Sequence, residues 1–242
     1  MPNRQFVPDV LDAVLKEAAS DKTRDIVVFD LDSTLLDNRP RQVAILREYG
    51  QEMGLPLVAH FEVESMDGWS LELSLQHCGL SSEEARAHKK QVYSFWETRF
   101  FTSQYCLYDV QTQGAADYVR EVLKAGARVV YCTGRHEAMK EGTIQNLVEQ
   151  GFPAPDEKSV FLLLKPYFEL EDDDWKKQAY TRISSLGGGV LAVFDNEPSH
   201  INGYKVAYPN AICVHLYTDE SGRGIAVHPD IPSIYDFVIP VK

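Results

Sequence analysis

The stretch from Ile26 to Leu36, which reads IVVFDLDSTLL, constrains the fold of this chain more than any other. Its first four residues form a short apolar run rich in β-branched side chains, which is typical of a strand buried on both faces of a parallel sheet. Two carboxylates, Asp30 and Asp32, follow this run. Neighbouring carboxylates repel each other and raise each other's pKa unless a cation lies between them, and oxygen ligands favour Mg²⁺. The alternative is an acidic, solvated turn at the end of a strand.

Length, charge and cysteine content limit the class of protein. A chain of 242 residues is long enough for one large domain or for one domain with an insertion. The formal charge of -12 argues against nucleic acid or an anionic membrane as a partner, so an anionic substrate needs a local group of positive charges. The cysteines lack C-x-x-C spacing, which predicts buried, reduced thiols. No apolar run approaches the roughly 18 residues of a membrane span, and no signal pattern begins the chain, so we expect a cytoplasmic protein.

Apolar runs alternate with amphipathic segments along most of the chain. This alternation predicts an α/β fold with a parallel sheet and right-handed crossovers. Strands are expected at residues 26–30, 128–132, 160–164, 190–194 and 211–217, and helices at 9–19, 115–123, about 144–148 and 172–186.

The interval from residue 38 to residue 108 lacks a strong strand pattern. Helical spacing is present in Arg39–Met53 and Trp69–Cys78, and Ser81 with Glu84 forms a capping box before a longer helix. The large aromatic side chains of this interval favour a small core over a cofactor site. We predict that residues 38–108 form a helical insertion, and that residues 1–37 and 109–242 form the main domain.

Polar groups follow four of the predicted strands. The first strand ends in Asp30 and Asp32, the second in Thr133-Gly134-Arg135, and the fourth in Asp195-Asn196-Glu197, while a lysine-bearing segment follows the third. Open parallel sheets bind ligands at the carboxyl ends of their strands. We therefore expect these groups to meet in one crevice.

These four segments resemble the motifs of D-x-D-x-T phosphatases in the haloacid dehalogenase (HAD) superfamily. The resemblance covers Ile26–Leu36, Val129–Arg135, Val160–Lys176 and Val190–Pro198. It implies a Rossmann-like, doubly wound sheet of order 5-4-1-2-3, counted along the predicted strands, with an α-helical cap inserted after the first motif. Residues 38–108 would then form a lid joined by short hinges.

The resemblance also implies a catalytic pair and a metal site. Asp30 would attack phosphorus and become an aspartyl-phosphate, and Asp32 would protonate the leaving group and then deprotonate water. Mg²⁺ would be held by Asp30, the backbone carbonyl of Asp32, and Asp195.

Phosphate binding would fall to the second motif and a lysine. Thr133 and Gly134 would bind phosphate oxygens, and Arg135 would contact substrate or form a structural salt bridge. Two lysines compete to neutralise the phosphate: Lys176, which we favour by its similarity to HAD phosphatases, and Lys165. Lys177 is a third candidate, and for each lysine the alternative is a solvated surface position.

The fourth motif departs from the family pattern, which often has two acidic residues in succession. Asn196 brings no charge, although it can orient a metal-bound water or the lysine, and the role of Glu197 stays open. His136 and His200 lie beside motifs and are expected on the surface or behind the residues that touch substrate.

The sequence thus predicts a Mg²⁺-dependent phosphatase of a small phosphomonoester. Two alternatives remain: a phosphotransferase with the same mechanism, and a non-catalytic HAD-like protein that binds a phosphorylated ligand. The motifs do not identify the substrate, because specificity in this family resides largely in the cap.

Overall fold

The computed structural model describes residues 7, 9–21 and 23–239. Its contacts divide the chain into two compact units. The first, which we call the core unit, comprises Met1–Leu36, Gln111–Glu137 and Leu147–Lys242. The second, the insertion unit, comprises Asp37–Val110 and Ala138–Asn146. Within the described residues, no helix is long and apolar enough to cross a lipid bilayer.

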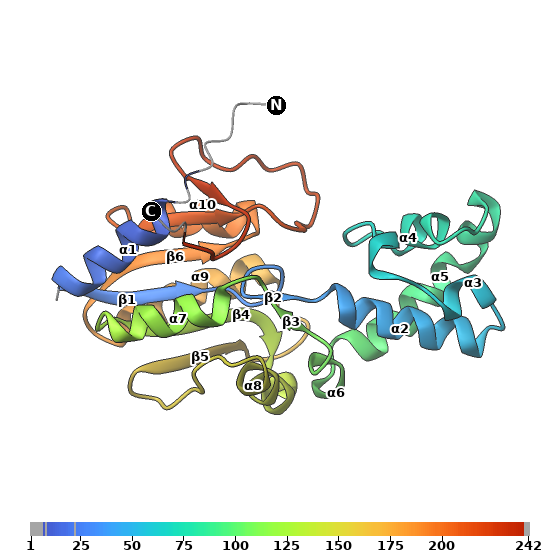
Figure 1. Ribbon diagram of the computed structural model, residues 1–242, viewed down its shortest axis with the longest axis horizontal. Helices are drawn as coiled ribbons and strands as arrows, with labels where there is room; N and C mark the ends of the chain where they lie inside the picture. Colours follow the sequence, from blue (N-terminus) through green and yellow to red (C-terminus); the bar gives the residue numbers. More distant parts are fainter. Residues whose placement is uncertain (1–6, 8, 22, 240–242) are drawn as a thin grey trace. The chain divides into compact units, whose positions relative to one another are not determined.

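The core unit is built on a six-stranded parallel sheet of order β5-β4-β1-β6-β7-β8 (Figure 1). This confirms the predicted fold class and the predicted order of five strands. The sixth strand was not predicted, because two residues are too few to show a sequence pattern. The strands are β1 (Arg24–Phe29), β4 (Arg128–His136), β5 (Val160–Lys165), β6 (Gly189–Asp195), β7 (Ile212–Leu216) and β8 (Ser233–Ile234).

Strand β1 lies in the middle of the sheet and is buried on both faces. Val27 and Phe29 join one hydrophobic core cluster, and Ile26 and Val28 join the other. Both clusters continue into helices on their own side of the sheet. The first includes residues of α1 (Asp9–Ser20) and α7 (Ala115–Lys124), and the second includes residues of α9 (Asp172–Ser185) and α10 (Pro198–Ala207).

Two differences from the sequence prediction concern the core unit. Strand β4 continues to His136 instead of ending at Cys132. Its register with β5 shifts between Cys132 and His136, and the pairing then resumes with His136 opposite Lys165. Helix α10 was not predicted, since polar residues interrupt the apolar spacing of Pro198–Ala207. Three cysteines are buried, free thiols as expected, whereas Cys78 is only half-buried.

The insertion unit is helical and has its own small core. Helix α5 begins with the capping box of Ser81 and Glu84. Inside the unit, the buried side chain of Arg41 pairs with that of Asp109, and its guanidinium lies 4.4 Å from the ring centre of Phe100. The elements are α2 (Arg39–Glu52), α3 (Pro56–Ala59), η1 (Val63–Ser65), α4 (Leu71–His77), α5 (Ser82–Phe100) and α6 (Ser103–Cys106).

The aromatic side chains of this unit pack on one another, as expected for a core. Trp96 stacks on Phe100 with ring centres 4.5 Å apart, and Trp69 and Phe101 meet the pair edge-on. Where the chain passes between the units, β2 (Leu36–Asp37) pairs with β3 (Val110–Gln111) in a separate two-stranded sheet.

A second chain segment belongs to the insertion unit. Residues 138–146, which cover η2 (Glu137–Met139) in part and most of α8 (Lys140–Glu149), contact α6 and the residues just after it. The Gly142 N–H donates to Ser103 Oγ over 3.2 Å, and Asn146 Nδ2 donates to the Asp109 carbonyl over 2.9 Å. A Cβ atom at Gly142 would lie 2.0 Å from the Ser103 carbonyl oxygen. The predicted interval 38–108 did not include this segment.

Candidate active site

The turn after β1 holds Asp30 at the carboxyl edge of the sheet. The Asp30 N–H donates to the Phe194 carbonyl over 2.9 Å, and 8% of the residue is exposed. The chain then reverses through Ser33, whose φ of 57° lies in the left-handed region. Thr34 fixes the turn, because its hydroxyl donates to Asn196 Oδ1 over 3.2 Å and accepts from the Asn196 N–H over 3.1 Å. The first and fourth motifs are therefore joined directly.

Lys176 bridges the two buried carboxylates of the site. Its ammonium donates to Asp30 Oδ1 over 2.7 Å, to Asp195 Oδ2 over 2.8 Å and to the Cys132 carbonyl over 2.9 Å. The residue is 1% exposed, although it begins the second turn of a surface helix. Trp175 beside it donates from Nε1 to the Thr133 carbonyl over 2.7 Å, which ties α9 to the second motif.

Burial and charge together set the ionisation of this group. Burial raises the pKa of Asp30 to about 7, with Asp195 acting in the same direction and Lys176 opposing it. Burial also disfavours the ionised form of Asp195, but Lys176 and His200 outweigh it and hold the Asp195 pKa below its usual range. Burial acts to lower the pKa of Lys176, yet Asp195 and Asp30 raise it well above its ordinary value. Lys176 is thus a permanent cation here.

Arg135 forms a bidentate salt bridge with Asp32. Its Nε donates to Asp32 Oδ2 over 2.8 Å and its Nη2 to Oδ1 over 2.9 Å, and the two side chains are 2% and 23% exposed. The salt bridge that was one of the two expectations for Arg135 is therefore present, and its contact with substrate stays a prediction. Thr133 is fully buried, and its Oγ1 accepts from the Arg135 N–H over 3.2 Å.

Lys165 and Gly134 meet the first turn of α9 through Asp172. The Lys165 ammonium lies 2.8 Å from Asp172 Oδ1 and 5.7 Å from the ring centre of Phe168. A Cβ atom at Gly134 would lie 3.0 Å from Asp172 Oδ2, so this position leaves little space for a side chain. Lys165 is on β5, the edge strand two places from β1. The lysine that reaches Asp30 is therefore Lys176, while Lys177 pairs with Asp174 in solvent.

Sequence reasoning did not find a second polar network, which surrounds His200. Its Nδ1 lies 3.6 Å from Asp195 Oδ1, and its Nε2 lies 3.0 Å from Asp173 Oδ1 without a favourable hydrogen-bond angle. Arg223 also contacts Asp173, and this hydrogen bond is the main reason why the Asp173 pKa is lowered. A hollow of about 320 Å³ between α9 and α10 is lined by Lys176, His200 and neighbouring residues. In the sequence, Arg223 lies in the glycine-rich stretch SGRG. That stretch has neither helical nor strand periodicity, so nothing in it indicated the network.

Comparison with solved structures identifies the fold. SP0104 from Streptococcus pneumoniae, a haloacid dehalogenase-like family hydrolase, is 14% identical with a TM-score of 0.51, and the match covers 88% of this chain and 94% of that one. The structure of a predicted phosphoglycolate phosphatase from Haemophilus somnus 129pt is 14% identical with a TM-score of 0.52, over 89% and 96% of the two chains. Protein Tyrosine Kinase A from Mycobacterium tuberculosis is 17% identical with a TM-score of 0.53, over 88% and 94%. This chain has the HAD-like fold. No family model and no curated protein matches its sequence.

The carboxyl edge of this HAD-like fold suits a cation bound through oxygen. When Asp30 and Asp195 are both ionised, Lys176 balances only one of their two charges. Asp30 Oδ2 has no hydrogen-bond partner among the described residues, whereas Asp195 Oδ1 accepts from the Glu197 N–H over 2.9 Å. Within the same residues, no group of three or more His, Cys, Asp or Glu side chains is placed to hold a metal. The Mg²⁺ ligands predicted from the sequence do not require such a group, because the third of them is the backbone carbonyl of Asp32. Carbonyl and carboxylate oxygens are suitable Mg²⁺ ligands.

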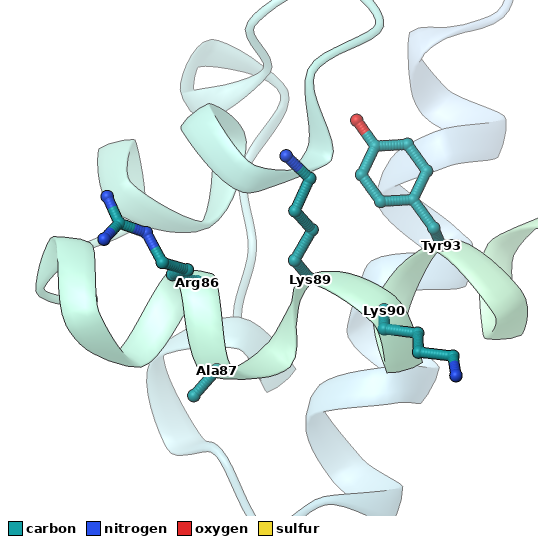
Figure 2. A pocket seen from close by; sticks show the side chains of 5 residues that line it. All are labelled: Arg86, Ala87, Lys89, Lys90 and Tyr93. Atoms are coloured by element: carbon teal, nitrogen blue, oxygen red, sulfur yellow. The ribbon is translucent and has the colours of Figure 1, made fainter.

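A separate hollow lies in the insertion unit of the HAD-like fold. Figure 2 shows its lining on α5, which consists of Arg86, Ala87, Lys89, Lys90 and Tyr93. Lys89 is already paired with Glu72 over 2.8 Å, which raises the pKa of the lysine and lowers that of the glutamate. None of the sequence-predicted site residues lines this hollow.

Proposed function

We propose that this protein is a Mg²⁺-dependent phosphatase that hydrolyses a small phosphomonoester through an aspartyl-phosphate on Asp30. The observation that supports this most is the position of Lys176 between Asp30 and Asp195. Phosphoryl transfer depends mainly on positioning and on stabilising negative charge, and a buried cation at the nucleophile supplies both.

Lys176 orients the nucleophile. Its hydrogen bond of 2.7 Å to Asp30 Oδ1 holds the carboxylate in place for attack on phosphorus. Burial removes water from this carboxylate, so the competing hydration of the nucleophile is small. The Thr133 hydroxyl and the Gly134 N–H would bind the oxygens of the transferred phosphoryl group, since the tight packing at Gly134 favours backbone contact over side-chain contact.

Asp32 would transfer the protons of the reaction. It would protonate the leaving oxygen in the first half and accept a proton from water in the second. Its salt bridge to Arg135 fixes the orientation of the carboxylate at the edge of the site. An arginine partner favours the ionised form of a carboxylate, which suits the second half of the reaction more than the first.

A bound Mg²⁺ would neutralise charge on the phosphoryl group as it is transferred. The Asp30 carboxylate, the Asp32 carbonyl and the Asp195 carboxylate would hold it. Lys176 would then share the two carboxylates with the metal.

The decisive experiment is a screen of phosphomonoesters with and without Mg²⁺, using the parent protein and Asp30→Asn. The substitution is nearly isosteric, so the folded structure should persist. We expect Mg²⁺-dependent release of phosphate by the parent and a loss of at least about a thousandfold in Asp30→Asn, as for removal of a covalent nucleophile. Turnover of the variant within tenfold of the parent would rule out the covalent route.

One observation favours a second candidate, a phosphotransferase. A structure with this fold is named a protein tyrosine kinase. The two activities share the aspartyl-phosphate and differ only in whether water or an alcohol accepts the phosphoryl group. Adding glycerol or tyrosine to the assay would separate them: a phosphatase releases all of the phosphate as inorganic phosphate, whereas a phosphotransferase forms a new ester in proportion to the acceptor.

A further inference from the structure

The connection between β7 and β8 is unusual for a parallel sheet. Parallel neighbours need a crossover of a dozen or more residues, and this is usually a helix. Here residues 217–232 contain no helix and return to the start of β8 as irregular chain. The two halves of this connection are held in different ways.

The second half is held by apolar packing along α10. Ile231 is buried in the core cluster on that face of the sheet, and Val227 packs against it. Asn202 of α10 fixes the backbone between them, donating to the Ala226 carbonyl over 2.9 Å and accepting from the His228 N–H over 2.8 Å.

The first half, residues 218–224, which we call the strap, has no such packing. From residue 218 to residue 224 it reads TDESGRG and has no apolar side chain. Gly222 and Gly224 both have positive φ, at 67° and 71°, and a Cβ atom at either would meet open space. Polar bonds alone therefore decide where the strap lies.

These bonds lead to the segments that carry the candidate active site. Thr218 donates its hydroxyl proton to the Ser33 carbonyl in the first motif. Asn196 Nδ2 donates to the Asp219 carbonyl over 2.6 Å. Ser221 donates to Glu197 from its N–H over 3.0 Å and from its hydroxyl over 2.9 Å.

Arg223 makes the contacts that close the strap. Its Nη1 donates to Asp173 Oδ2 over 2.9 Å, and its Nη2 donates to Glu197 Oε1 over 3.0 Å and to Ser199 Oγ over 2.7 Å. Asp173 lies three residues before Lys176 on α9. One side chain thus joins the strap to the helix of the catalytic lysine and to the fourth motif.

We propose that Arg223 is a positioning residue, which clasps the strap to Asp173 and Glu197 so that the strap forms a wall of the substrate site on the β6–β7 side of the sheet edge. This inference depends on the proposed function only in taking the bound molecule to be a substrate. It also explains the fourth motif: Asn196 and Glu197 stand next to Asp195 as anchors of the strap. The departure from two successive acids follows, because an amide can donate to the Asp219 carbonyl and a carboxylate cannot.

Hydrogen exchange tests the clasp without any need for turnover. We compare the backbone amides of residues 218–224 in the parent, in Arg223→Ala and in Arg120→Ala. The last is a matched control, an exposed arginine on α7 that is paired with Asp117. Exchange of the strap should accelerate about tenfold or more in Arg223→Ala and stay unchanged in the control, because local opening follows the loss of the bonds that hold a segment. Unchanged exchange in Arg223→Ala would overturn the clasp.

Steady-state kinetics with p-nitrophenyl phosphate and Mg²⁺ test the wall. We expect KM to rise about three- to tenfold in Arg223→Ala with kcat within about threefold, because the strap touches bound substrate and not the reacting atoms. Arg223→Lys should recover part of the loss. Glu197→Gln should raise KM by a similar factor and add little to Arg223→Ala, because both changes open the same clasp.

The outcomes separate the two proposals. Faster exchange of the strap with an unchanged KM would show that the strap is clasped but is not a wall of the site. A fall in kcat with an unchanged KM would also overturn the wall, since it would place Arg223 in the alignment of α9. A parent protein that hydrolyses no phosphate ester would contradict the proposed function, and the clasp would then be judged by exchange alone.

Discussion

Lys176 and Lys177 are adjacent in the sequence and have opposite environments. The side chain of Lys176 is 2% exposed and lies between two carboxylates, whereas that of Lys177 is 68% exposed and pairs with Asp174 over 3.1 Å. Breaking a buried ion pair leaves an uncompensated charge in the protein, while an exposed pair contributes little to stability. The pair of residues therefore offers a built-in comparison.

Lys176→Met should destabilise the protein by about 3–5 kcal/mol, because it leaves Asp30 and Asp195 facing each other in a buried site. Lys177→Met should change the free energy of unfolding by less than about 0.5 kcal/mol. Urea unfolding of the two variants beside the parent measures both values. Equal stability of the two variants would show that Lys176 is not buried between the carboxylates, and a large gain on adding Mg²⁺ to Lys176→Met would support a cation at the same place.

Asp32→Asn tests the proton donor. An amide cannot protonate the leaving oxygen, so the loss of kcat should be larger for alkyl phosphates than for p-nitrophenyl phosphate, whose leaving group needs little protonation. We expect the two losses to differ by at least about tenfold. Equal losses on both substrates would count against Asp32 as the acid and would leave it as a partner that fixes Arg135.

At the scale of elements, α9 is the helix on which the site depends. Besides Lys176 it supplies Trp175, whose indole N–H bonds to the Thr133 carbonyl, and Asp172, which pairs with Lys165. One helix thereby links β1, β4, β5 and β6 at their carboxyl ends. A substitution in its first turn should therefore disturb the geometry of several motifs together.

Trp175→Phe should lower stability by about 1–3 kcal/mol, because it leaves the buried Thr133 carbonyl without a donor. The matched control is Trp96→Phe in the insertion unit, since the buried Nε1 of Trp96 has no hydrogen-bond partner to lose. Thermal unfolding of both variants isolates the hydrogen bond from the change in ring size. A larger loss in Trp96→Phe than in Trp175→Phe would contradict the role of the indole N–H.

Sequence patterns predicted those elements that have a long local signal. The four apolar residues before Asp30 and the acidic first turn of α9 are such signals, and both elements lie where expected. The clasp at Arg223 has no such signal, because its partners are 24 to 50 residues away in sequence and are chosen by the return path of the β7–β8 connection. The same holds for the Lys165–Asp172 pair, whose geometry depends on how α9 enters the sheet edge.

At the scale of the whole molecule, the chain passes between the two units at residues 36–37, 110–111, 137–138 and 146–147. A lid hinged only near residues 37–38 and 108–109 would have two connections. Asp109 is fully buried and paired with Arg41 inside the insertion unit, so it is a poor hinge. If the insertion unit moves, we expect the bending at the unit boundaries near residues 36–37, 110–111, 137–138 and 146–147.

We therefore expect a phosphate mimic, aluminium fluoride with Mg²⁺, to change hydrogen exchange in residues 36–37, 110–111 and 137–138. Closure of a lid alters the hydrogen bonding of its connections while the cores of both units stay intact. The amides of β1 serve as the internal control, because they lie in the middle of the sheet. Unchanged exchange at all three connections would show that the insertion unit is not a moving lid.

The burial of Lys176 also has a use in chemical labelling. An acylating reagent attacks only a neutral, accessible amine, and Lys176 is neither, while Lys177 beside it is open to the reagent. In the native protein a brief reaction should modify Lys177 and leave Lys176 intact, and both should react in urea. Fragmentation of the single peptide that contains them gives the ratio of the two. That ratio measures the unfolded fraction of the protein from within one peptide, even in a crude extract.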